Sequence, residues 1–133
     1  MTYTRNAVYD SVVKAITAEF PNCYCTSRNV GKPTSFPACY IREMDRSRPL
    51  RYTQLDFEDV QWESTFEIQI ASDKHGTAAS EAYKIMDVAR SAFSSLYYRE
   101  FTETSVDNGT MFILIGRFRR VIGGGDIMPT TGD

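Results

Sequence analysis

The stretch that decides the fold is Trp62-Glu63-Ser64-Thr65-Phe66-Glu67-Ile68-Gln69-Ile70. Its apolar side chains alternate with polar ones, and the polar positions include Glu63, Thr65, Glu67 and Gln69. Successive side chains of a strand point to opposite faces, so this period of two predicts a strand with one buried face. The chain is therefore expected to build a sheet that is covered on one side.

Two segments with helical periodicity flank this strand. The first runs from about Thr4 to Glu19 and ends at Pro21, because proline disfavours the helical conformation at the residue before it. Its apolar positions are Val8, Val12, Val13, Ile16 and Phe20. The second begins after Gly76, with Thr77 as the expected N-cap. Its apolar positions are Ala82, Ile85, Met86, Ala89, Phe93 and Leu96. The spacing predicts two amphipathic helices, of which the second is the stronger.

Four further strands are expected, arranged as two hairpins. Asn22 to Ser27 and Ala38 to Met44 read as strands on either side of a loop rich in Gly, Pro and Ser, and we expect them to pair as a hairpin. Phe101 to Val106 and Met111 to Val121 flank an Asn-Gly turn, which predicts a closing hairpin. The apolar run from Met111 to Ile115 indicates a central strand covered on both faces, and one cover can be another subunit.

The predicted order is α-β-β-(long loop)-β-α-β-β, without the alternation that builds a parallel sheet. We therefore expect an α+β fold in which two helices pack on one face of a mostly antiparallel sheet. Residues 1–121 are expected to form a single domain, followed by a Gly-rich C-terminal tail over 122–133.

The bulk composition restricts the function. The chain has 133 residues, and its 15 basic and 17 acidic residues give a net charge of −2. A chain without a positive field is a poor binder of nucleic acid phosphates. No apolar run approaches the ~20 residues that a membrane span needs. We expect neither stable nucleic acid binding nor a membrane anchor.

No motif indicates catalysis, and we expect no enzyme activity, cofactor or metal. Phosphate-binding loops and nucleophile elbows are absent from the sequence. Cys23, Cys25, Cys39 and His75 are the residues that a rival function, a small zinc-binding or cysteine-dependent protein, would use. Cys23 and Cys25 share one face of a strand, whereas zinc knuckles place Cys-x-x-Cys pairs on turns. The preferred interpretation is partly buried thiols in a hairpin.

The segment from Asp45 to Gln61 is expected to be a long exposed loop, because it carries Pro49 and many charges. Basic residues precede acidic ones, so the two ends of the segment have opposite charge. One interpretation is a solvated loop with weak internal ion pairs; the other is head-to-tail docking of identical copies, in which the basic end meets the acidic end of the next copy. The candidate interface residues are Arg42, Asp45, Arg46, Arg48, Arg51, Asp56, Glu58, Asp59, Arg117, Arg119 and Arg120.

Several of these stretches resemble tail terminator (tail-completion) proteins of long-tailed bacteriophages. The resemblance lies in Phe36-Pro37-Ala38-Cys39-Tyr40-Ile41-Arg42-Glu43-Met44-Asp45, in the run from Phe66 to Lys74, in the alanine-rich helix around Ser80 to Ser95, and in the closing strand from Met111 to Arg120. It covers roughly Tyr3 to Val121. The shared features are the order and character of the elements rather than catalytic residues.

The resemblance implies a virion protein at the head-proximal end of the tail. Such a subunit forms a hexameric ring that caps the tail tube, ends its polymerisation and provides the joint to the head. Its implied partners are further copies of itself, the major tail tube protein and a head-side connector or head-completion protein. DNA would pass through the lumen without specific binding, and Asp56 and Asp59 are candidates to line it and repel DNA. A neighbouring head-tail connector or neck subunit is the closest alternative function.

Overall fold

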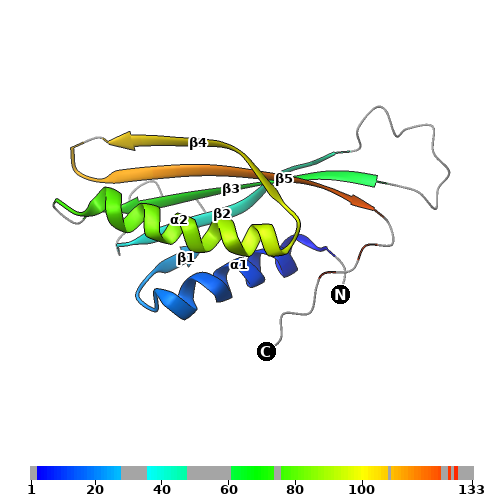
Figure 1. Cartoon of the computed structure of the whole chain (residues 1–133), viewed down its shortest axis with the longest axis horizontal. Helices are drawn as coiled ribbons and strands as arrows, with labels where there is room; N and C mark the ends of the chain where they lie inside the picture. Colours follow the sequence, from blue (N-terminus) through cyan, green and yellow to red (C-terminus); the bar gives the residue numbers. More distant parts are fainter. Residues whose placement is uncertain are drawn as a thin grey trace.

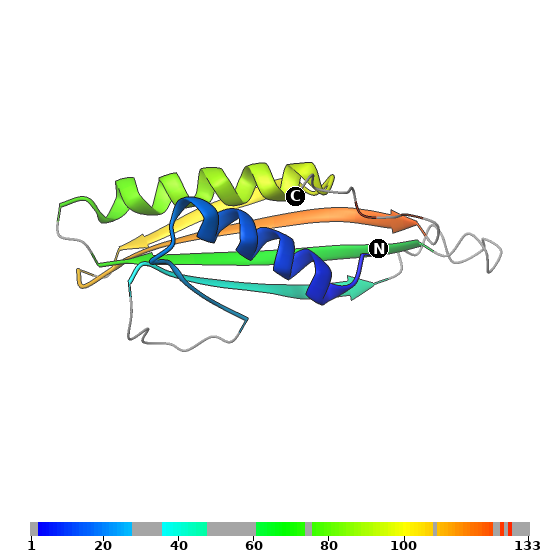
Figure 2. The same ribbon diagram turned by 90° about the horizontal axis from the view of Figure 1, so that it is seen from below.

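The computed structural model describes residues 3–27, 36–47, 61–73, 76–107, 109–123, 126 and 128. The elements in chain order are α1 (Arg5–Glu19), β1 (Tyr24–Thr26), β2 (Ala38–Ser47), β3 (Gln61–Ser72), α2 (Ala78–Ser95), β4 (Arg99–Asp107) and β5 (Phe112–Gly123). The strands form one sheet in the order β1-β2-β3-β5-β4, and both helices pack on the same face of it (Figures 1 and 2). The predicted α+β class is confirmed.

The core lies between the helices and the sheet. Val8, Val12 and Ile16 of α1 are fully buried, as the helical spacing predicts. All six apolar positions predicted for the second helix are buried as well. In β3 the alternating positions Phe66, Ile68 and Ile70 are fully buried against the helices. The hydrophobic patterns therefore identified the buried side of both helices and of the deciding strand.

The pairing of β1 with β2 corrects the first hairpin prediction. The two strands run parallel, with Cys25 opposite Cys39, whereas a hairpin requires antiparallel strands. A parallel pair needs a connection of about a dozen residues that carries the chain back to its starting end. The prediction of a hairpin for these two strands is therefore wrong. The second predicted hairpin, β4 with β5, is antiparallel as expected.

Four of the strands, β2 to β5, extend beyond their predicted bounds, and the extensions of β2 and β5 affect the candidate residues. β2 continues to Ser47, so Asp45 and Arg46 lie on a strand and not in the long loop. β5 continues to Gly123, and its position between β3 and β4 agrees with the prediction of a central strand. Beyond it, Asp126 accepts a hydrogen bond from the Gly123 amide, and Met128 is 7% exposed in the core.

The two helix starts differ in a way that stability measurements can detect. The Thr4 hydroxyl accepts a hydrogen bond from the Ala7 amide, whereas Thr77 makes no side-chain cap. Replacing a capping threonine by alanine costs about 1 kcal/mol. We expect Thr4→Ala to lower the free energy of unfolding in urea by about that amount and Thr77→Ala to lower it by clearly less. Equal losses would contradict the assignment of the cap.

Candidate functional site

The eleven candidate interface residues separate into three groups. Arg48, Arg51, Asp56, Glu58 and Asp59 lie outside the described residues, so the docking and lumen predictions for them stay predictions. Arg46 and Arg120 are engaged inside the fold. Arg42, Asp45, Arg117 and Arg119 lie on the face of the sheet that the helices leave uncovered.

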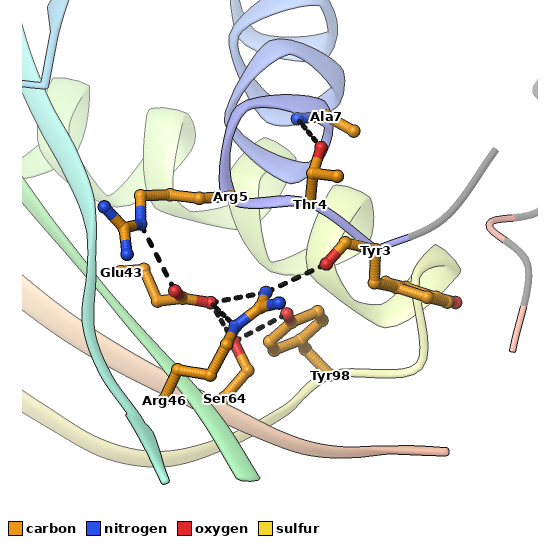
Figure 3. A network of polar contacts seen from close by, with 8 residues as sticks. All are labelled: Tyr3, Thr4, Arg5, Ala7, Glu43, Arg46, Ser64 and Tyr98. Atoms are coloured by element: carbon orange, nitrogen blue, oxygen red, sulfur yellow. Dashed lines mark hydrogen bonds and ion pairs between the residues drawn. The ribbon is translucent and has the colours of Figure 1, made fainter. Parts of the chain in front are cut away.

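Arg46 points into the protein because of a β-bulge. The register between β2 and β3 shifts between Glu43 and Asp45, so the extra residue Met44 brings Arg46 opposite the buried Ser64. There Arg46 pairs with Glu43 at 2.7 Å and donates to the Tyr3 carbonyl at 2.9 Å (Figure 3). The prediction that Arg46 lies in an open loop is therefore wrong, and its side chain is engaged within the fold.

Glu43 is the centre of this polar cluster. Its side chain is 1% exposed, and it accepts hydrogen bonds from Arg5, Arg46 and the Ser64 hydroxyl. Figure 3 shows these groups converging from the start of α1, from β2 and from β3. The Tyr98 hydroxyl completes the cluster by donating to Ser64 at 2.9 Å. A buried carboxylate with this many donors fixes where α1 begins relative to the sheet.

Arg120 connects separate segments of the fold in a similar way, close to the N-terminal segment and the end of β5. Its side chain is 11% exposed, and it donates to the Leu96 carbonyl, to the Tyr3 hydroxyl and to Asp126. The guanidinium also stacks over the Tyr3 ring, 4.1 Å from its centroid. Arg120 thus joins the N-terminal segment, the end of α2 and Asp126, so the guanidinium that was predicted to contact a neighbouring copy is engaged within the fold.

The uncovered face of the sheet carries a row of charges across its central strands. Arg42, Glu67 and Arg117 are register partners on β2, β3 and β5, and Arg117 pairs with Glu67 at 2.9 Å. One step further along the strands, Asp45 is exposed and Arg119 lies 4.0 Å from Glu63. These exposed or half-exposed groups are the predicted interface residues that the structure leaves facing outward.

Two strand edges at opposite ends of the sheet lack a neighbour among the described residues. On one side β4 is the last strand, and most of its residues are exposed. On the other side β1 pairs only with Ala38, Cys39 and Tyr40, so β2 from Ile41 to Ser47 has β3 on its inner side and no described strand on its outer side (Figure 2). An unpaired edge presents a row of backbone donors and acceptors to any strand of suitable shape.

A second bulge determines which charged side chains of β4 point toward α2. The register of β4 on β5 shifts between Glu100 and Thr102, so Glu100 and Glu103 both reach Arg90 of α2, at 2.9 and 3.2 Å. Charged side chains often protect a sheet edge against pairing. Here two of those charges are tied to the helix, while Thr102, Thr104 and Val106 remain as uncharged side chains on the opposite face.

Three cysteine thiols, which the sequence analysis named for the rival zinc-binding or cysteine-dependent function, form a cluster. The Sγ atoms of Cys23 and Cys39 lie 3.2 Å apart, and all three Sγ atoms lie within 4.8 Å of one another. Hydrogen bonds from the other two thiols lower the pKa of Cys25 to about 4, and the bond to Cys25 raises that of Cys23 to about 12. The parallel pairing of β1 and β2 creates the cluster, so the hairpin prediction concealed it. His75 lies outside the described residues.

Comparisons with known proteins leave the family of this chain open. No protein family model matches the sequence, and no curated protein matches it either. None of the described helices combines the length and the apolar character required to cross a membrane.

The Glu43 cluster gives a stability prediction with an internal control. Glu43→Ala removes the acceptor for two arginines and a buried hydroxyl, and breaking a buried ion pair costs several kcal/mol. Because Arg46 is partly exposed, we expect a loss of roughly 2 to 4 kcal/mol in urea unfolding. Asp45→Ala, on the same strand but on the uncovered face, should change stability by less than about 0.5 kcal/mol. Similar effects of the two variants would argue against the inward role of Glu43.

The buried Tyr98 hydroxyl predicts a loss of stability at high pH. Burial raises its pKa to about 12, from the ordinary tyrosine value of 10.0. Between these values the unfolded chain loses the phenolic proton while the folded chain keeps it, so stability is complete below pH 10 and falls as pH rises toward 12. The loss amounts to roughly 3 kcal/mol. Unfolding curves of the wild type and Tyr98→Phe should converge over this range, and a constant difference between them would refute the assignment.

Proposed function

We propose that this protein is a ring-forming structural subunit, and specifically a tail terminator of a long-tailed bacteriophage. The observation that carries the proposal is that two edges on opposite sides of one sheet, β4 and the Ile41–Ser47 part of β2, have no further strand beside them within the described part of the chain. A subunit with two different free edges can pair with a second copy at each of them. Such head-to-tail contacts generate a ring when the rotation between copies closes.

The contact that we propose joins β4 of one copy to the free part of β2 in the next. Backbone hydrogen bonds between edges supply the affinity, and the side chains that flank them select the orientation. Arg42 and Asp45 are exposed on the β2 side, and Arg99 and Asp107 are exposed on β4. Charges of both signs at each edge allow a complementary register and penalise pairing in the wrong direction. The expected number of copies in the ring, six, comes from the resemblance to tail terminator proteins.

A closed ring explains why such a protein ends tube growth. Once every edge is paired within the ring, no free edge remains to template another layer. In the proposed assembly one side of the ring contacts the major tail tube protein and the other receives the head-side connector. The charged segment that follows β2 is the proposed contact with these neighbours and with the lumen, through which DNA passes. The proposal places the protein in the virion and assigns it no catalytic reaction.

Electron microscopy of tails assembled with and without this chain tests the function. In its absence we expect tubes that grow past their normal length and fail to join heads. A length distribution that is unchanged without the chain would contradict the proposal. Images of isolated tails also separate the closest alternative, since a head-tail connector or neck subunit would stay with the capsid instead of the tube.

The edge contact has its own variant test. The variant carries two lysines on β4, Thr104→Lys and Val106→Lys, which add repulsive charge to an exposed edge. Lysine residues at an edge commonly prevent it from pairing with another strand. We expect a folded monomer, with stability within about 0.5 kcal/mol per substitution of wild type, that no longer caps tubes. The matched control, Ser80→Lys with Ser94→Lys, adds the same charge to exposed positions of α2 and should cap normally. Capping by the β4 variant would exclude this edge.

A further inference from the structure

The thiols of Cys23, Cys25 and Cys39 come together through the topology of the sheet. Cys25 and Cys39 are register partners on the parallel strands β1 and β2, so their side chains lie on the same face. Cys23 precedes Cys25 by two residues and shares that face. The three sulfur atoms therefore converge from two strands at the end of the sheet where β1 is attached.

The spacing of the sulfur atoms fits the coordination of a single ion. A tetrahedral ion with metal-to-sulfur bonds of about 2.3 Å holds its sulfur ligands about 3.8 Å apart. The observed separation is 3.2 Å between Cys23 and Cys39 and at most 4.8 Å for the other pairs, so no pair is more than about 1 Å too far apart. Shifts of a fraction of an ångström in the side chains, without backbone movement, would bring all three sulfurs into range.

The surroundings of the thiols also suit an ion. Cys23 is 6% exposed and Cys39 is fully buried, whereas Cys25 is half-buried, so the cluster has two sheltered ligands and one that solvent reaches. Buried thiols without a ligand behave as small apolar side chains, which would not require three of them to gather in one place. Thiolate ligands select soft cations over hard ones such as magnesium and calcium.

We propose that Cys23, Cys25 and Cys39 form a three-thiolate site for a thiophilic cation of the Zn²⁺ or Cu⁺ type. Three metal-sulfur bonds form, and the protons of the thiols that are still protonated leave to solvent. With Zn²⁺ a water molecule takes the fourth position, as in other sites with three protein ligands. The bound ion ties β1, which has only three residues, to the start of β2. The inference is independent of ring formation, because it concerns a site within one chain.

Metal titration of the purified reduced chain tests this site. Co²⁺ is the spectroscopic probe, because thiolate-to-cobalt charge-transfer bands report the number of sulfur ligands. We expect one Co²⁺ per chain with a three-thiolate spectrum, its displacement by one equivalent of Zn²⁺, and protection of all three thiols from alkylation. A parallel titration with Cu⁺ under anaerobic conditions shows which of the two cations the site prefers.

Variants decide whether the cluster is the binding site. Cys25→Ser is the primary variant, because Cys25 is half-buried and serine is of similar size, so we expect this variant to fold. It should weaken Zn²⁺ binding at least as much as the ~10- to 100-fold lost when an outer-shell group is removed. Thr26→Ser on the same strand is the control and should bind like wild type. Wild-type protein that binds neither Zn²⁺ nor Cu⁺, or a Cys25→Ser variant that binds as tightly as wild type, would overturn the proposal.

Discussion

The packing of α2 across the middle of the sheet is the interaction on which the rest of the structure depends. Phe93 of α2 stacks on Phe118 of β5 with ring centroids 4.4 Å apart, and Phe66 of β3 and the buried Tyr98 surround the pair. Because α1 and α2 both lie on this face, the opposite face and the two outer edges receive no cover from the described residues. A chain of this kind buries its core well while keeping strand edges accessible to other chains.

Two bulges then divide the charged residues between structure and surface. At Met44 the bulge turns Arg46 inward to Glu43, and in β4 the bulge near Phe101 directs Glu100 and Glu103 to Arg90. Bulges commonly redirect a side chain at the border of a sheet. The charged side chains that point inward anchor the helices to the sheet. The charged side chains on the uncovered face are the ones that the proposed contact between copies can use.

Much of the fold could be predicted from the sequence because it depends on local patterns. The period of two around Phe66 and the period near 3.6 around Phe93 identify their elements and their buried faces without knowledge of distant contacts. The direction of β1 could not be obtained in this way, since a loop rich in Gly and Pro suits a hairpin as well as a crossover. The bulges carry no local signal either, so the inward direction of Arg46 appeared only with the fold. The ion pair between Arg120 and Asp126 likewise depends on contacts that no local pattern reveals. The closeness of the three thiols could not be predicted for the same reason, since it depends on the parallel pairing that places Cys39 beside Cys25.

The central claim is that the two open edges of the sheet meet between identical copies. A cryo-electron microscopy map of the head-proximal end of the tail, at a resolution that separates strands, tests this most directly. The account predicts a ring in which β4 of each copy lies beside the Ile41–Ser47 part of β2 in the next, so that the sheet continues across every subunit boundary. A ring whose copies meet through other surfaces, with both edges facing solvent, or a tail end that lacks this protein, would contradict it.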